Sequence, residues 1–244
     1  MQLPKDERLI VALDVPSYSE AEKLIKDISG PVKYFKVGSQ LFTACGPKIV
    51  ELIKTQGGKI FLDLKFHDIP NTVGKAAVSA VELGVDMFNL HAMGGFEMME
   101  EAGNAAIEAC ARFKKPKPVI LGVTVLTSFD EATFSDVLGA PGRGIPEQVL
   151  HLARLTKSAG LDGVVASPQE IELLRKNMPE DFVILTPGIR PLDAEVGDQK
   201  RILTPGRAIA LGADYLVVGR PITGAKDRNA AANNIQKEIQ DAIK

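Results

Sequence analysis

Eight short apolar segments recur along the chain, and each is followed by polar or glycine- and proline-containing residues and then by a helical pattern. Each segment is nearly continuous in hydrophobic residues, which is typical of strands buried on both faces of a parallel sheet. We therefore predict one strand in each segment. The segments are RLIVALD (8–14), VKYFKV (32–37), KIFLDL (59–64), VDMFNLH (85–91), KPVILGVTVL (117–126), DGVVA (162–166), FVILT (182–186) and DYLVVG (214–219).

Eight β-α units within 244 residues favour a closed (β/α)₈ barrel over an open doubly wound sheet. A dinucleotide-binding sheet would need G-x-G-x-x-G after its first strand, whereas LDVPSYSE (13–20) stands there. No linker, low-complexity tract or repeat is evident beyond the β-α alternation. The predicted fold is therefore an α/β TIM barrel in which residues 1–244 form a single domain.

Four glycines precede predicted strands at the points where helical patterns stop. Glycine adopts the left-handed conformation without strain, and it commonly ends helices in that way. We expect this conformation at Gly30, Gly84, Gly160 and Gly212.

Composition excludes several classes of protein. The formal charge of −2 provides no basic surface for nucleic acid. Cys45 and Cys110 are far apart and in no metal-like spacing, which favours reduced thiols. The first residues, MQLPKDERLIVALD, lack the apolar core of a signal peptide, and no apolar run reaches the roughly 18 residues of a membrane span. We expect a cytoplasmic protein without membrane or nucleic-acid partners.

Polar residues gather at the carboxyl ends of the predicted strands. In a (β/α)₈ barrel the active site lies at this end, where strands run into the following loops. A barrel without a site has little reason to collect lysine and aspartate there. The residues concerned are Asp14, Lys36, Asp63, Lys65, Asn89, His91, Thr127, Ser128, Arg190 and Arg220.

The stretch FLDLKFHDIPNT (61–72) is the densest part of this set. Residues 63 and 65 are two apart, so on a strand Asp63 and Lys65 face the same side. Lys36 on the neighbouring strand can reach Asp63, and Asp68 follows where the chain turns into a helix. Alternating charges of this kind keep each group ionised. A salt-bridge lattice that only closes the barrel is the alternative, although buried ion pairs seldom repay their desolvation.

Two glycine-containing turns, TPGIRP (186–191) and VVGRPIT (217–223), follow the last two predicted strands. The loops after strands 7 and 8 commonly bind phosphate in this fold. Gly188 and Gly219 would let backbone N–H groups approach an anion, and Arg220 would add a charge-assisted fork. The turns therefore predict a phosphate site.

The chain resembles the orotidine 5′-monophosphate decarboxylase family, in its bacterial form. The resemblance runs from the first strand to the last, and no motif departs from the family pattern. The motifs that carry it are ALD (12–14), FKVG (35–38), DLKFHDIPNT (63–72), LTS (126–128), TPGIRP (186–191) and VVGRPIT (217–223).

The resemblance implies decarboxylation of orotidine 5′-phosphate to UMP, in pyrimidine biosynthesis, without a cofactor or metal. Lys65 would protonate C6 of the pyrimidine, with Asp63 beside it. Asp14 and Lys36 would hold the ribose hydroxyls. The implied catalytic set is Lys65, Asp63, Asp68 and Lys36.

The resemblance also implies a homodimer, because Asp68 and Thr72 would reach the partner subunit's site. Ser128 would contact the pyrimidine, and Thr127 belongs to the same turn. The phosphate would be bound by Arg190, Gln199, Gly219 and Arg220.

Two other functions fit part of the pattern. A sugar-phosphate decarboxylase or aldolase of the same superfamily shares D-x-K-x-x-D but uses Mg²⁺ on carboxylates. A nucleotide-binding protein without catalysis would need the phosphate loops but not the alternating Lys/Asp set.

Overall fold

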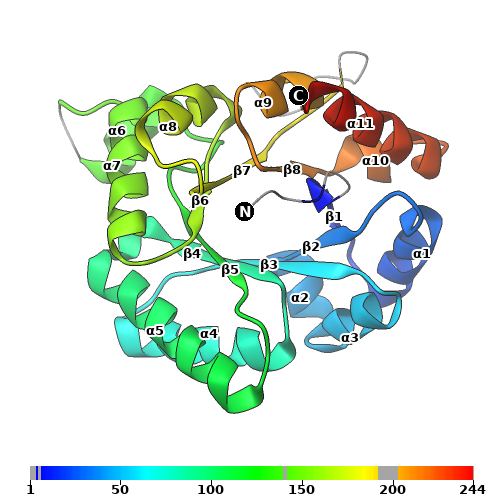
Figure 1. Ribbon diagram of the computed structural model, residues 1–244, viewed down its shortest axis with the longest axis horizontal. Helices are drawn as coiled ribbons and strands as arrows, with labels where there is room; N and C mark the ends of the chain where they lie inside the picture. Colours follow the sequence, from blue (N-terminus) through cyan, green and yellow to red (C-terminus); the bar gives the residue numbers. More distant parts are fainter. Residues whose placement is uncertain (1–3, 5–6, 140–141, 192–202, 244) are drawn as a thin grey trace.

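The structure, a computed structural model, describes residue 4 and residues 7–139, 142–191 and 203–243. Eight parallel strands pair in chain order and close into a barrel, with the last strand beside the first, which confirms the predicted fold (Figure 1). The strands are β1 (Leu9–Ala12), β2 (Tyr34–Gly38), β3 (Lys59–Phe66), β4 (Met87–His91), β5 (Val119–Val123), β6 (Gly163–Val165), β7 (Val183–Pro187) and β8 (Tyr215–Val218).

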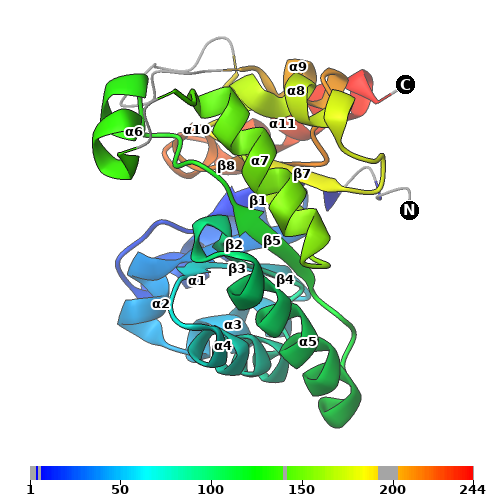
Figure 2. The ribbon, with the colours of Figure 1, turned by 90° about the vertical axis from the view of Figure 1, so that its left-hand side faces the viewer.

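Helices surround the barrel, as Figure 1 shows, and α5 and α7 pack as neighbours outside it (Figure 2). Within the described residues, no helix combines the length and the apolar character needed to cross a bilayer. The helices are α1 (Tyr18–Ile28), α2 (Ser39–Cys45), α3 (Lys48–Thr55), α4 (Pro70–Leu83), α5 (Phe96–Phe113), α6 (Glu131–Leu138), α7 (Ile145–Ser158), α8 (Ile171–Asn177), α9 (Pro205–Ala210), α10 (Arg220–Thr223) and α11 (Arg228–Ala242), with the 3₁₀ turns η2 (Ala92–Gly94) and η3 (Pro168–Glu170).

The core has two layers because alternate strand residues face opposite sides. On β1, Leu9 and Val11 pack outward against the helices. Ile10 and Ala12 face the barrel interior, where Phe61 and Leu185 also lie. Burial of these apolar surfaces in both layers is the main stabilising contribution to the fold. The interior layer also forms the floor on which a site at the barrel mouth can rest.

Two local predictions were wrong. The strand expected to run to residue 126 ends at Val123, whose partners His91 and Val165 are themselves the last residues of β4 and β6. Gly30 does not adopt a left-handed conformation: α1 ends at Ile28, its C-cap Ser29 has φ −62°, and Val32 N–H donates to Ile28 O. The chain therefore leaves this helix without a positive φ.

A short Gly-x-Asp repeat exists that was not expected. Gly84, Gly160 and Gly212 have φ of 72°, 77° and 108°, as predicted for helix ends. The aspartate that follows each glycine by two residues pairs with an isoleucine at the start of the preceding strand. Its N–H donates to the isoleucine carbonyl, and its carboxylate accepts the isoleucine N–H at 2.8–2.9 Å. The pairs are Asp86–Ile60, Asp162–Ile120 and Asp214–Ile184.

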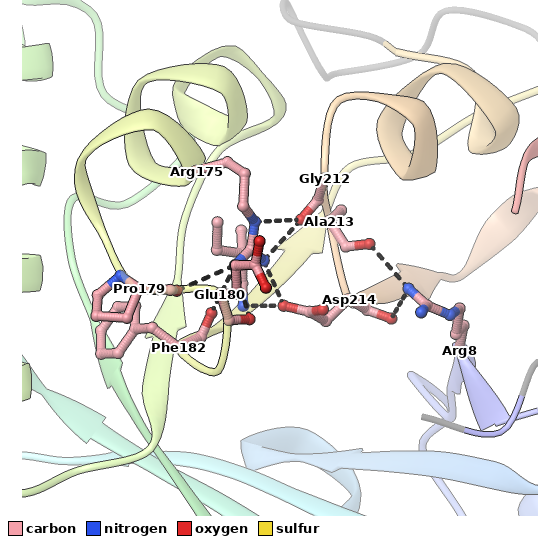
Figure 3. Close-up of polar contacts among 9 residues, drawn as sticks. Arg8, Arg175, Pro179, Glu180, Phe182, Gly212, Ala213 and Asp214 are labelled. Atoms are coloured by element: carbon pink, nitrogen blue, oxygen red, sulfur yellow. Dashed lines mark hydrogen bonds and ion pairs between the residues drawn. The ribbon is translucent and has the colours of Figure 1, made fainter. Parts of the chain in front are cut away.

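The third pair is reinforced by Arg175, which Figure 3 shows between α8 and the start of β8. Its Nη2 donates to Asp214 Oδ2 at 2.6 Å and to Gly212 O at 2.7 Å. Its Nη1 donates to the carbonyls of Pro179, Glu180 and Phe182. Arg175 therefore joins the turn that precedes β7 to the turn that precedes β8, at the amino-terminal end of the barrel.

Replacing Asp214 with alanine should lower the free energy of unfolding by about 2 kcal/mol, because Ile184 N–H and the Arg175 guanidinium both lose an acceptor. Urea denaturation measures the change. Asp181→Ala, at an exposed position in the turn before β7, is the matched control and should stay within about 0.5 kcal/mol of the unsubstituted protein. Equal effects of the two substitutions would show that the Asp214 pairing does not stabilise the barrel.

Candidate active site

A cavity of about 430 Å³ opens at the carboxyl ends of the strands. Its size falls within the usual range for small-molecule sites, about 300–1,000 Å³. Its floor is apolar and includes Phe61, Leu185 and Val217 from the barrel interior. Charged side chains form its rim. The predicted site residues that line it are Asp14, Lys36, Asp63, Lys65, Thr127, Arg190, Gly219 and Arg220.

Four charged groups form a chain of alternating sign along one wall of the cavity. Lys36 Nζ lies 2.9 Å from Asp14 Oδ1 and 3.3 Å from Asp63 Oδ2. Lys65 Nζ lies 2.6 Å from Asp63 Oδ1. The observed order is therefore Asp14–Lys36–Asp63–Lys65. The fourth charged group was expected to be Asp68, next to Lys65, but it is Asp14, next to Lys36.

The middle of this chain is buried: Lys36 and Asp63 are each 9% exposed. Burial disfavours the ammonium of Lys36, but the carboxylates of Asp63 and Asp14 outweigh it and hold the pKa of Lys36 above its ordinary value. Lys36 is therefore a permanent cation. It compensates Asp63, and Lys65, which also lines the cavity, is the more exposed of the two lysines.

The backbone at Lys65 departs from a regular strand. Lys65 has φ 52°, a left-handed conformation that is uncommon for a residue with a side chain. The β3–β4 register shifts between Leu62 and Phe66. Lys65 N–H donates to Asn89 Oδ1 at 2.9 Å, and Asn89 Nδ2 donates to Asp63 Oδ1 at 2.7 Å. Asp63 and Lys65 thus meet as predicted, but through an irregular strand end.

The loops after β7 and β8 form the opposite wall. Gly188 has φ 80°, a conformation that favours glycine. Arg190 is buried, and its N–H donates to Leu203 O at 3.1 Å, next to the Ile189–Leu203 bridge. Arg220 begins α10, directly after β8. Arg190 and Arg220 both line the cavity, and a guanidinium group is well suited to bind a phosphate.

The comparisons with known proteins agree with this arrangement. A family model described as "Orotidine 5′-phosphate decarboxylase / HUMPS family" matches residues 7–235. The chain is 53% identical over 236 residues to an orotidine 5′-phosphate decarboxylase of Syntrophotalea carbinolica, covering 97% of this chain and 96% of the relative. It is 50% identical over 234 residues to that of Moorella thermoacetica, covering 96% and 92%.

The chain belongs to the orotidine 5′-phosphate decarboxylase / HUMPS family. Among solved structures, an orotidine 5′-phosphate decarboxylase from Lactobacillus acidophilus superposes with a TM-score of 0.85 at 38% identity, covering 96% of this chain and 99% of that one. The similarity spans the whole barrel, so it includes both walls of the cavity.

Three described residues that the family resemblance assigns to the site do not line this cavity in the single chain. Asp68, Thr72 and Ser128 are exposed, and they lie in or near the loops after β3 and β5. Asp68 Oδ1 accepts the N–H of Ile69. Gln199 lies outside the described residues.

Asn89 is a site residue to which sequence reasoning assigned no role. It is 1% exposed and contacts both Asp63 and Lys65. A polar residue inside the apolar run VDMFNLH was the available signal, because a buried amide needs partners. Its partners lie on another strand, and therefore the pattern of β4 alone could not identify them.

The two histidines beside the cavity do not line it. The His67 and His91 rings lie 5.2 Å apart between centroids. Burial, with His67 and Lys65 nearby, lowers the pKa of His91. His91 is therefore neutral at physiological pH.

Proposed function

We propose that this protein decarboxylates orotidine 5′-phosphate to UMP, in pyrimidine biosynthesis. The observation that carries the proposal is the Lys65 ammonium, held by Asp63 at 2.6 Å on the rim of a cavity whose other wall bears Arg190 and Arg220. The curated relatives at about half identity carry the same activity in their names. A single barrel domain, residues 1–244, would perform the reaction.

The proposed chemistry is electrostatic. The bond between C6 and the carboxylate breaks, CO₂ leaves, and the electron pair stays on C6 as a vinylic carbanion. Lys65 stabilises this charge as it develops and then transfers a proton from Nζ to C6, after which water reprotonates the amine. Asp63 holds the ammonium in place, and Lys36 offsets the second carboxylate oxygen of Asp63.

The remaining polar groups would orient the substrate. Asp14 and Lys36 are proposed to bind the ribose hydroxyls, and Thr127 and Ser128 to lie near the pyrimidine. Binding energy from the distant phosphate can raise the rate only where it is realised in the transition state. The proposed phosphate ligands are Arg190, Gln199, Gly219 and Arg220.

Incubating the purified protein with orotidine 5′-phosphate in excess EDTA tests the reaction. Loss of the substrate's absorbance together with formation of UMP is expected, because the proposed chemistry uses no metal or cofactor. Loss of activity in EDTA, restored by Mg²⁺, would instead favour the sugar-phosphate branch of the family. Binding of UMP without any turnover would indicate a nucleotide-binding protein.

Gly38 should be needed for the position of Lys36. A Cβ atom at Gly38 would lie 2.9 Å from Lys36 Nζ and 3.6 Å from Asp14 Oδ1, while its φ of −91° suits any residue. Gly38→Ala should therefore fold normally but lower kcat/KM about tenfold or more by displacing the ammonium. Gly30→Ala, where a Cβ would meet no atom closer than 3.8 Å, should keep full activity. Steady-state kinetics compare the two, and equal activities would contradict the expected role.

We also propose a homodimer. Exposed apolar side chains follow three consecutive strands at the mouth: Ile69 after β3, Met93 and Phe96 after β4, and Leu126 after β5. Ile69 is 66% exposed, and such a group of side chains at one end of the barrel is typical of an interface. Asp68 stands next to Ile69, so pairing through this face would carry it toward the partner's cavity.

Mixing two inactive variants tests the shared site. A dimer of one Lys65→Ala chain and one Asp68→Ala chain contains one site with both wild-type residues. Random reassortment should restore about a quarter of full activity, since half the dimers are mixed and each has one intact site of two. No recovery upon mixing, or a monomer in sedimentation, would contradict the shared site.

Action in the cytoplasm remains a prediction.

A further inference from the structure

We propose that Asn89 is a positioning residue, which fixes Lys65 and Asp63 relative to each other at the point where β3 becomes irregular. The inference rests on the proposed decarboxylation. Asn89 does not line the cavity, so it acts through its two neighbours.

The first contact holds the backbone of Lys65. At the register shift between Leu62 and Phe66, Lys65 N–H donates to Asn89 Oδ1 at 2.9 Å. A left-handed residue that carries a side chain persists only where its surroundings hold it there. The φ of 52° at Lys65 therefore depends on an acceptor at the position of Asn89 Oδ1. Without it, Lys65 would return to an extended conformation and its ammonium would move.

The second contact holds the carboxylate of Asp63. Because a backbone N–H can only donate, the oxygen of the Asn89 amide faces Lys65 and its nitrogen faces Asp63. Asn89 Nδ2 donates to Asp63 Oδ1 at 2.7 Å, and the same oxygen accepts from Lys65 Nζ at 2.6 Å. The other oxygen, Oδ2, faces Lys36 at 3.3 Å. Asn89 therefore selects which carboxylate oxygen meets each lysine.

Only a side chain with one acceptor and one donor on the same carbon can make both contacts. Asn89 is 1% exposed, so water is not available to replace either bond. Leucine has nearly the same shape and makes neither contact. Aspartate can accept from Lys65 N–H, but when ionised it presents a second negative charge to Asp63. When protonated, aspartic acid reproduces the donor and the acceptor of the amide.

This difference between the variants makes a specific test possible. We would measure kcat and KM for orotidine 5′-phosphate in Asn89→Leu and Asn89→Asp, with rates expressed per UMP-binding site so that unfolded protein does not contribute. Thr124→Val is the matched control, because Thr124 is also 1% exposed but, among the described residues, bonds only to the carbonyl of Val165.

For Asn89→Leu we expect kcat to fall about 100-fold, the scale of a misplacement of about 1 Å, while KM changes little because Arg190 and Arg220 are untouched. Thr124→Val should retain wild-type kcat. The ratio of the Asn89→Asp kcat to the wild-type kcat should rise about tenfold as pH falls and the new acid is protonated.

Three outcomes decide the question. A kcat within threefold of wild type in Asn89→Leu would overturn the inference, and so would an Asn89→Asp ratio that does not vary with pH. A low kcat in Asn89→Leu with recovery of Asn89→Asp at low pH would support it. If the wild-type protein itself does not turn over orotidine 5′-phosphate, the proposed function fails before Asn89 is tested.

Discussion

Replacing Lys65 with alanine should lower kcat for orotidine 5′-phosphate by about 10⁴-fold or more, because one substitution removes both the proton donor and the cation beside C6. The barrel should survive, since Lys65 is partly exposed and its only described carboxylate partner, Asp63, keeps Lys36 and Asn89. Steady-state kinetics at saturating substrate measure the loss, and circular dichroism checks the fold.

Lys59 offers a matched control on the same strand. Lys59 begins β3 and bonds Glu7 at 2.7 Å, at the opposite end of the barrel from the cavity. Lys59→Ala therefore removes a paired lysine without touching the site, and kcat should stay unchanged. If Lys65→Ala kept its kcat within tenfold of wild type, Lys65 would not be the acid.

The second large effect is expected at Arg220. Arg220→Ala should lower kcat/KM for orotidine 5′-phosphate by about 10²–10³-fold, the value of two charge-assisted hydrogen bonds to a phosphate. Orotidine, which lacks the phosphate, should lose almost nothing, because the guanidinium has no group to bind. The difference between the two substrates isolates the interaction between arginine and phosphate.

Arg228 provides the control for the loss of one arginine charge, because it lies outside the cavity. It pairs with Asp27 at 2.8 Å and does not line the cavity. Arg228→Ala should leave kcat/KM unchanged for both substrates. An equal loss on orotidine and its phosphate in Arg220→Ala would remove Arg220 from the phosphate site.

The barrel could be predicted because hydrophobic periodicity reports burial, and burial decides where strands form. The alternation of side chains along a strand predicted that Asp63 and Lys65 would meet, and their charged groups lie 2.6 Å apart, although β3 is irregular at Lys65. The ends of elements were less accurate. The expected strand 117–126 stops at Val123, where its partners on β4 and β6 also end, and those partners are distant in sequence.

The remaining features depend on contacts between strands. The left-handed Lys65 has no local signal, since nothing in DLKF requires a positive φ. Asn89, whose amide supports that conformation, comes from β4. The Gly-x-Asp motifs before β4, β6 and β8 are visible in the sequence, but the sequence does not show which residues their aspartates bond. Each aspartate acts on an isoleucine of the preceding strand.

The position of the Lys65 ammonium relative to a bound pyrimidine is the central claim, and a crystal structure with UMP in the cavity measures it. Lys65 Nζ should lie about 3–3.5 Å from C6, the separation of atoms ready to react, while still bonded to Asp63. A nitrogen that points away from the base, or lies more than about 5 Å from C6, could not deliver the proton and would contradict the proposed mechanism.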